Sequence, residues 1–302
     1  MQWFTNGILA SAILLQIAIS FHIIYTTVRF FHLAHAGTYT TGAYVAYGVF
    51  WLLSQFFVPT GGQAAPFLAY GASTLAAMLF CGLLGVGMDQ IVYAPLRRRG
   101  ASPLILLLAS FGIAVVIENV IVLICGNEIR SVQAGPVREA HLLAGVRLTT
   151  TQIGIVISSG VLFAGLSAIY RLTDIGKVVR GVAEDPLGAS LVGIDPEKVT
   201  RLAFFLGSAL AGLAGAITSL ETNLEPTMGF LSLLRGVAAI IVGGIGSLWG
   251  LLLGCLILGV SENLAAWYLP AGWKDAVAFA ILICFLILKR EGLLGVREQR
   301  AG

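Results

Sequence analysis

The sequence predicts an all-α fold: a polytopic transmembrane helical bundle with eight or nine spans. Of its 302 residues, 58% are hydrophobic and only 11% are charged, whereas charged residues make up about a quarter of a soluble domain. Several apolar runs reach the ~20 residues that a helix needs to cross a bilayer. These runs lack the alternating pattern of a membrane barrel, and backbone groups in lipid must be satisfied internally, so the spans are expected to be helices.

Nine apolar runs are the candidate spans. In chain order they cover residues 7–28, 37–58, 65–88, 103–124, 151–172, 202–220, 230–245, 248–269 and 276–288. The first run follows no basic segment and precedes no clear cleavage site, so we interpret it as a retained span. Runs 230–245 and 276–288 are short, and one of them can be re-entrant or strongly tilted. The count is therefore eight or nine.

Basic residues predict the orientation of the bundle. They gather at 97–99, at 171–201 and at 289–300, in three connections separated by even numbers of spans. Cytoplasmic connections carry an excess of Lys and Arg, so these three are placed in the cytoplasm and the N-terminus outside. The 125–150 connection, with Arg130, Arg138 and Arg147, then lies outside. The net charge of +3 gives no reason to expect nucleic acid binding.

The most polar connection contains two helix starts. Asp185-Pro186 and Asp195-Pro196 each place a good N-cap residue before a proline at the first helical position. The first helix is expected to run from 186 to about 192, where Gly193 ends it. The second continues into the apolar run without a stop signal. The sequence thus predicts one short, isolated helix in the cytoplasm.

Polar residues also occur within the apolar runs. Glu118 and Glu262 each precede an asparagine, and His32 and His35 precede a threonine-rich start of the second run. Such residues are costly at membrane depth and can line a solute pathway. Equally, they can be hydrogen-bonded interior groups or lie near span ends. The candidate pathway residues are His35, Gly37, Thr38, Thr41, Glu118, Asn119 and Glu262.

The motifs of common enzymes and metal sites are missing. The sequence holds no HExxH, no GxSxG and no paired cysteines with metal-ligand spacing, so we expect no catalysis, cofactor or metal. The Gly176-Lys177 pair is not a P-loop, because Arg171 stands at the first glycine position and Val178 follows the lysine. Small residues recur every four positions at Gly207, Ala211 and Gly215 and at Gly246, Gly250 and Gly254, which predicts close helix packing.

The polar connection resembles a known signature. Its sequence TDIGKVVRGVAEDPLGASLVGIDPEKV is similar to the cytoplasmic loop of the permease subunits of ABC importers for branched-chain amino acids. The matching positions are Thr173, Gly176, Arg180, Ala183, Asp185, Leu191, Gly193 and Ile194, and Gly181 stands where alanine is usual. Blocks at 32–47, 93–104, 226–230, 237–254 and 291–295 are also similar and keep their order. The resemblance covers nearly the whole chain.

The resemblance implies a single transmembrane permease domain, 1–302, with a coupling loop at 173–200. It implies a multi-pass protein in the lipid bilayer of a bacterial-type inner membrane. Its expected partners are a second permease subunit, two ATP-binding cassette subunits that hydrolyse ATP, and an extracytoplasmic solute-binding protein. The short helix would dock on an ATPase subunit. The residues implied in coupling are Arg180, Asp185, Pro186, Leu187, Ala189, Leu191 and Gly193.

Three alternatives remain open at this point. Relatives of the family import urea and short amides, and Glu118, where members often carry glutamine, leaves the solute undecided, as does the unusual His32. An ion-coupled secondary transporter would need internal repeats and an ion site, which the sequence does not reveal. A passive amide channel would favour symmetric halves. Neither of the last two needs an isolated coupling helix, which favours the importer.

Overall fold

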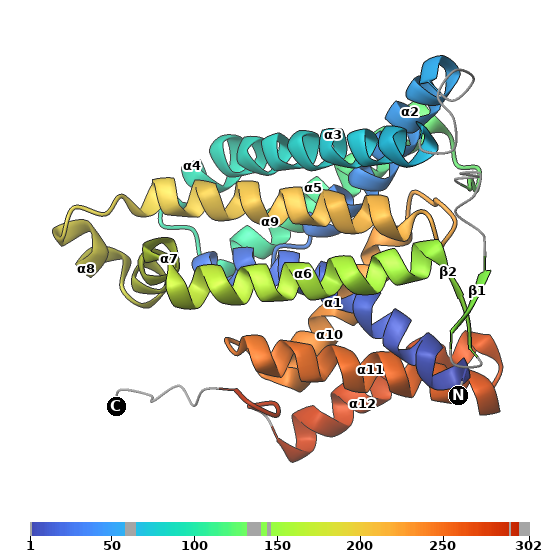
Figure 1. Ribbon diagram of the computed structural model, residues 1–302. Coiled ribbons are helices and arrows are strands. Elements are labelled where there is room, and N and C mark those ends of the chain that lie inside the picture. The colour runs from blue at the N-terminus through green and yellow to red at the C-terminus, as the bar shows by residue number, and fades with distance from the viewer. Residues whose placement is uncertain (1, 58–64, 132–139, 144–145, 290, 296–302) are drawn as a thin grey trace.

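The computed structural model describes residues 2–57, 65–131, 140–143, 146–289 and 291–295. It is a bundle of helices with a short two-stranded hairpin at one end (Figure 1). The helix α1 (Gln2–Val28) lies at the centre, because it packs against α6, α9, α10 and α11 and most of its residues are buried. The all-α expectation is confirmed apart from the hairpin, which the sequence analysis did not foresee.

All nine predicted runs fold as helices. After α1 they are α2 (His35–Phe57), α3 (Ala65–Met88), α5 (Pro103–Cys125), α6 (Thr150–Leu172), α9 (Pro196–Thr218), α10 (Met228–Gly243), α11 (Leu248–Tyr268) and α12 (Lys274–Leu288). The shorter elements are the π-helix η1 (Asp89–Tyr93), α4 (Ala94–Arg98), β1 (Ala140–Leu143), β2 (Val146–Thr149), α7 (Asp174–Glu184), α8 (Pro186–Leu191) and the 3₁₀-helix η3 (Ala271–Trp273).

Fewer helices qualify as membrane spans than the sequence predicts. Six helices among the described residues are long and apolar enough to cross a membrane: α1, α3 with its continuation to Arg98, α5, α6, α9 and α11. The helices α10 and α12 have only 16 and 15 residues, short of the ~20 that a span needs. The expected count of eight or nine spans is therefore not confirmed.

The two ends of the bundle differ in the elements they carry. The helices α4, α7 and α8 lie at one end, and the hairpin and the N-terminus lie at the other (Figure 1). Two of the three basic connections thus share an end, as the charge pattern predicts. Arg138, Arg290, Arg297 and Arg300, which also entered that prediction, lie outside the described residues.

Small residues allow the central helices to approach closely. A Cβ atom on Gly215 would lie 2.0 Å from the carbonyl oxygen of Tyr39, and one on Gly207 would lie 2.8 Å from that of Ser20. On α11, a Cβ on Gly254 would lie 2.0 Å from the carbonyl oxygen of Ala239. The predicted close packing is confirmed at these positions. Gly246, by contrast, lies in the turn before α11, with a φ of +89°.

Candidate functional site

The connection from α6 to α7 is built by three of the signature residues. The Thr173 hydroxyl accepts a hydrogen bond from the Gly176 amide at 3.4 Å and caps α7. A Cβ on Gly176 would lie 2.6 Å from the carbonyl oxygen of Tyr170, so only glycine lets α7 fold back onto the end of α6. Arg180 Nη1 donates to that same Tyr170 carbonyl oxygen. The helix α7 was not among the elements that the sequence predicted.

The short helix α8 forms as the sequence predicts, ending within one residue of the expected place. The Asp185 carboxylate accepts from the Leu187 amide at 3.0 Å, and Pro186 occupies the first turn. Gly193 has a φ of +84°, a conformation that glycine adopts without strain and that ends a helix. The Asp195 carboxylate then accepts from the Glu197 amide at 3.0 Å, and α9 continues without a break.

The helix α8 has one buried and one exposed face. Ala189 is buried against Val182 of α7 and Val199 of α9, so these three helix segments share a small core. Leu187 and Leu191 point outward and are 78% and 88% exposed. The family resemblance implied that Ala189, Leu187 and Leu191 all take part in coupling, but in the fold they lie on opposite faces of α8. The exposed apolar side chains, together with Val192, form the tip of α8.

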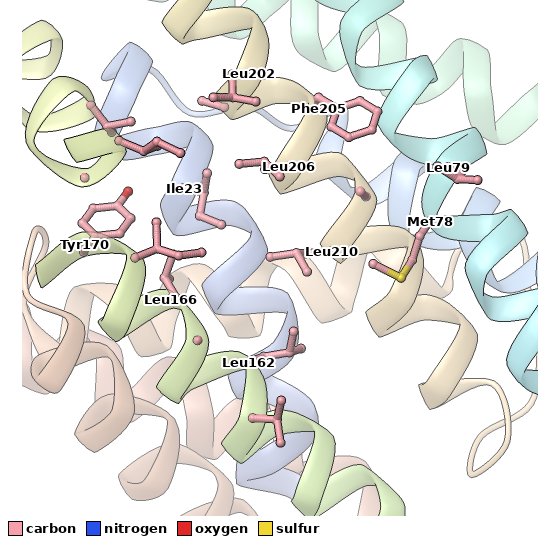
Figure 2. A pocket seen from close by; sticks show the side chains of 18 residues that line it. Ile23, Met78, Leu79, Leu162, Leu166, Tyr170, Leu202, Phe205, Leu206 and Leu210 are labelled. Carbon is pink, nitrogen blue, oxygen red and sulfur yellow. The ribbon is translucent and has the colours of Figure 1, made fainter. Parts of the chain in front are cut away.

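A cleft of about 420 Å³ opens beside this unit, between α6 and α9 (Figure 2). Leu162, Leu166 and Tyr170 on α6 face Leu202, Leu206 and Leu210 on α9. Ile23 of α1 lies between the two rows, and residues of α3 and α7 complete the walls. The Tyr170 hydroxyl, which hydrogen-bonds to the Thr26 hydroxyl at 3.1 Å, is a rare polar group in this lining. No sequence motif indicated the cleft.

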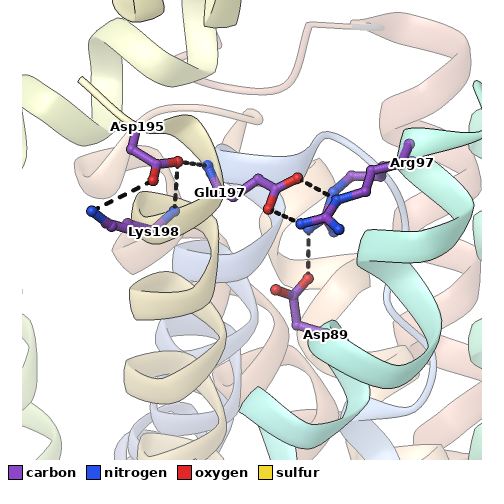
Figure 3. Close-up of polar contacts among 6 residues, drawn as sticks. Asp89, Arg97, Asp195, Glu197 and Lys198 are labelled. Carbon is purple, nitrogen blue, oxygen red and sulfur yellow. Dashed lines mark hydrogen bonds and ion pairs between the residues drawn. The ribbon is translucent and has the colours of Figure 1, made fainter. Parts of the chain in front are cut away.

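Two ion pairs involve α4: one joins it to the start of α9 and the other joins it to η1 (Figure 3). Arg98 Nε donates to Glu197 Oε1 at 2.8 Å and Arg98 Nη2 donates to Glu197 Oε2 at 2.5 Å. Arg97 Nη2 lies 2.7 Å from Asp89 Oδ1 in η1, and the Asp89 side chain is 2% exposed. The bidentate pair belongs to the second residue of α9, immediately after α8. We call the Arg98–Glu197 pair the clamp.

The predicted pathway residues of α2 make contacts within the bundle, although Nδ1 of His35 has no hydrogen-bond partner among the described residues. His35 is buried, and its Nε2 lies 2.8 Å from the Ser20 hydroxyl. The Thr38 and Thr41 hydroxyls donate to carbonyl oxygens one turn earlier in the chain, at 3.1 and 2.7 Å. Gly37 lies against Ile117 of α5, where a Cβ would come within 2.9 Å. Each hydroxyl keeps acceptor capacity, so these contacts do not exclude a role in solute passage.

The two predicted carboxylates belong to different parts of the bundle. Glu118 is half-buried on α5, which packs against α2. The neighbouring Asn119 is exposed and donates to the Val115 carbonyl oxygen at 2.8 Å. Glu262 lies on α11, which packs against α1, α10 and α12. It is 4% exposed, and its Oε1 has no hydrogen-bond partner among the described residues. Glu262 therefore lies among a different set of packed helices from the α2–α5 group.

An ion pair that the sequence analysis missed lies near Glu262. Arg235 Nε of α10 donates to Asp275 Oδ1 of α12 at 2.6 Å. Arg235, Asp275 and Lys274 are the charged groups that act on the Glu262 carboxylate. The signal was available, because Arg235 is the one charged residue in the apolar run 230–245, and an ionisable residue in such a run usually has a partner or a function.

The family model and the most similar known proteins agree on one family. The profile of the family described as "Branched-chain amino acid transport system / permease component" matches residues 3–286. The high-affinity branched-chain amino acid transport system permease protein LivH of Escherichia coli is 29% identical over 305 residues, which cover 99% of this chain and 96% of LivH. The corresponding permease protein BraD of Pseudomonas aeruginosa is 28% identical and covers 99% and 96%.

More distant similarity extends to other permeases. The ribose import permease protein RbsC of Haemophilus influenzae is 28% identical over 145 residues, 46% of this chain and 45% of RbsC. Among solved structures, PsaBC of Streptococcus pneumoniae in complex with a Fab aligns with a TM-score of 0.50 at 13% identity, covering 96% of this chain and 94% of that chain. At this identity the likeness concerns the fold alone.

The family profile covers the helices described above except the first residue of α1 and the last two residues of α12. It includes the capped helix α8 and the residues that fold α7 onto α6. The chain therefore belongs to the family of branched-chain amino acid transport system permease components.

Proposed function

We propose that this chain is a transmembrane subunit of an ATP-driven importer that carries branched-chain amino acids across a bacterial inner membrane. Its partners would be a second permease subunit, two ATP-binding cassette subunits and an extracytoplasmic solute-binding protein. ATP hydrolysis would belong to the cassette subunits. The chain would cross the membrane eight or nine times, with α2 (23 residues) as a further span and the shorter helices α10 and α12 tilted or supported by their neighbours.

The observation that carries this proposal is the tip of α8. Leu187 and Leu191 are exposed apolar side chains at the end of the bundle that also carries α4 and α7 (Figure 1), on a helix too short to be stable alone. Buried contacts of Ala189 with α7 and α9 hold this helix in place. Apolar side chains displayed on a fixed helix suit a groove on a partner protein. We infer that the partner is an ATPase subunit.

Motion of α8 would reach the spans through α9. The small core of Val182, Ala189 and Val199 makes α7, α8 and the start of α9 one unit. The helix α9 in turn packs against α1, α2 and α3. When the ATPase subunits close, a displacement of α8 would therefore rotate or shift α9 against the central helices. Such rigid-body shifts of packed helices are a common form of conformational switching.

The seven coupling residues would have different roles. Leu187 and Leu191 would contact the ATPase, while Asp185, Pro186 and Gly193 fix the ends of α8. Ala189 would act inward, by packing. Arg180 would act through the Tyr170 carbonyl oxygen, by holding α7 on α6.

Cross-linking tests the docking directly. Single cysteines at Leu187 and Leu191 should cross-link to a co-expressed ATPase subunit, because both side chains are exposed. A cysteine at Ala189 is the matched control on the same helix, since that side chain is buried. Equal cross-linking at Ala189 and Leu191, or none at any position, would contradict the proposed docking face.

The solute passage is proposed to run along the α2 segment from His35 to Thr41 and the α5 face with Glu118 and Asn119, with Glu262 as a further contributor. Weak contacts suffice for a subunit that receives its solute from a binding protein. Enlarging Thr41 to Leu should lower leucine uptake by the complete transporter in vesicles, with Ser54, a half-buried residue whose hydroxyl bonds within the far end of α2, as the control position. If the transporter takes up urea and leucine does not inhibit that uptake, the chain belongs to an amide importer instead.

A further inference from the structure

We propose that the cleft between α6 and α9 binds an acyl chain of an anionic phospholipid from the cytoplasmic leaflet, with its headgroup held by basic residues of α7. This inference rests on the proposed membrane orientation. It concerns a site that the solute pathway and the α8 tip do not use. The lipid would occupy the space that separates α6 from α9 and would touch α7, the helix that supports α8.

The walls of the cleft suit a hydrocarbon chain. Leucine side chains of α6 and α9 face each other across it, and the Tyr170 hydroxyl is already engaged with Thr26. A zwitterionic amino acid in this space would lose its hydration without gaining hydrogen-bond partners, which costs several kcal/mol for each charged group. An acyl chain has no such cost and gains roughly 0.8 kcal/mol for each buried methylene group.

The depth of the cleft matches one leaflet. Its lining on α6 extends from Val161 to Tyr170, and nine helical steps of 1.5 Å span about 14 Å. The hydrocarbon core of a bilayer is about 30 Å thick, so one leaflet supplies about 15 Å. The lined halves of α6 and α9 are those that end at α7 and α8. The cleft therefore lies at the depth of the leaflet on the coupling side.

The mouth of the cleft lies at α7, which carries two cationic side chains, Lys177 and Arg180. The helix α7 closes this end with Ile175 and Val179 toward the cleft. Lys177 pairs with the exposed Asp174 at 2.9 Å, and Arg171, at the end of α6, lies over the Trp249 ring of α11. Arg180 is exposed and lies beside the lining residue Tyr170, to whose carbonyl oxygen one of its five N–H groups donates. Basic residues at the cytoplasmic surface attract anionic headgroups.

A helix from a second subunit fits this cleft less well. Helices that associate in membranes present small residues, which let their backbones approach. On α9, however, the side chains that line the cleft include Leu202, Phe205, Leu206 and Leu210. The small residues Gly207 and Gly215 face α1 and α2 instead. Large side chains leave narrow gaps between them, which a flexible acyl chain can fill.

Two glycines of α6 provide a matched test. Gly165 lines the cleft, and a Cβ built there meets nothing within 4 Å, so Gly165→Leu starts a side chain in open space and extends it into the cleft. Gly160, on the same helix, also has open space at its Cβ but does not line the cleft. Gly160→Leu is therefore the control. Both changes replace a glycine within a helix, so their direct effects on helix stability should be alike.

The measurement is native mass spectrometry of the full-length chain after exchange into vesicles of phosphatidylglycerol and phosphatidylcholine in equal parts. The unsubstituted chain should retain phosphatidylglycerol in severalfold excess over phosphatidylcholine. Gly165→Leu should lose the retained lipid severalfold, and Gly160→Leu should not. The double substitution Lys177→Gln with Arg180→Gln should make the retention of the two lipids equal, while circular dichroism checks that the helices remain.

Three outcomes would overturn the proposal. Equal lipid retention by Gly165→Leu and Gly160→Leu would show that the cleft is not the site. Equal retention of both lipids by the unsubstituted chain would remove the role of the basic mouth. A cross-link from a cysteine at Gly165 to a second permease subunit would show a subunit interface instead. Because lipid retention is measured without uptake, failure here is distinguishable from failure of the proposed transport function.

Discussion

Arg98 and Glu197, which lie 99 residues apart in the sequence, form a bidentate ion pair between α4 and the first turn of α9. Arg97, beside Arg98, pairs with Asp89 in the π-helix η1, which continues α3. The helices α7 and α8 and the start of α9 are thus connected to the spans in two ways: by the packing of α9 against its neighbours and by the clamp. A π-helix within a long helix often lies at a functional position. This connection would let α3 respond when α8 moves.

The clamp can be tested by exchange of its charges. Arg98→Glu and Glu197→Arg should each lower solute-stimulated ATPase activity of the assembled transporter, because each leaves two like charges facing each other. The double exchange should recover much of the activity. The side chains are 67% and 40% exposed, so thermal stability should change little. Lys198, whose pair with Asp195 has the longer separation of 3.7 Å, is the control, and Lys198→Ala should leave coupling intact.

Removal of the α8 cap should uncouple transport from ATP hydrolysis. Asp185→Ala deletes the acceptor of the Leu187 amide, and loss of such a cap costs roughly 0.5–2 kcal/mol of helix stability. Leucine uptake in reconstituted vesicles should fall while the binding protein still docks. Asp185→Ser, which keeps a capping oxygen, should retain uptake. Full uptake by Asp185→Ala would show that α8 is held without its cap.

The pair of Arg235 and Asp275 should stabilise the packing of α10 against α12. Arg235→Ala would remove the cation that pairs with Asp275 and one of the two cations that act on Glu262, so the melting temperature of the purified chain should fall. The double substitution Arg235→Met with Asp275→Leu should recover stability, because an apolar pair avoids the cost of removing charges from water. A single substitution as stable as the original chain would contradict this role.

Accessibility labelling checks the orientation. A cysteine at Glu128, exposed in the connection after α5, should react with a membrane-impermeant reagent in intact cells. A cysteine at Arg99 or Leu191 should react only after the cells are opened, because α4 and α8 lie at the opposite end from the hairpin (Figure 1). The reverse pattern would show an inverted protein and would also exclude ATPase docking on α8.

Sequence signals that involve residues within one helical turn correctly predicted helix ends in this chain. The Asp-Pro pairs and Gly193 predicted both ends of α8, because capping and turn formation involve residues only a few positions apart. The helix α7 was missed, although Ile175, Val178, Val179 and Val182 repeat at helical spacing between charged residues. The nine apolar runs could be predicted as helices because their hydropathy is read from consecutive residues, without reference to the helices that pack against them.

The tertiary structure alone decided which of these residues meet. Leu191 and Ala189 occupy the same short helix, yet one is exposed and the other is buried, because α7 and α9 cover only one side of α8. Likewise, Glu197 finds Arg98 only once α4 and α9 lie side by side, and the cleft exists only because α6 stands apart from α9. The sequence determined local helix ends and apolar runs. Each depends only on residues that are close together in the chain. Long-range contacts depend on how whole helix faces fit together in space, which no short stretch of sequence encodes.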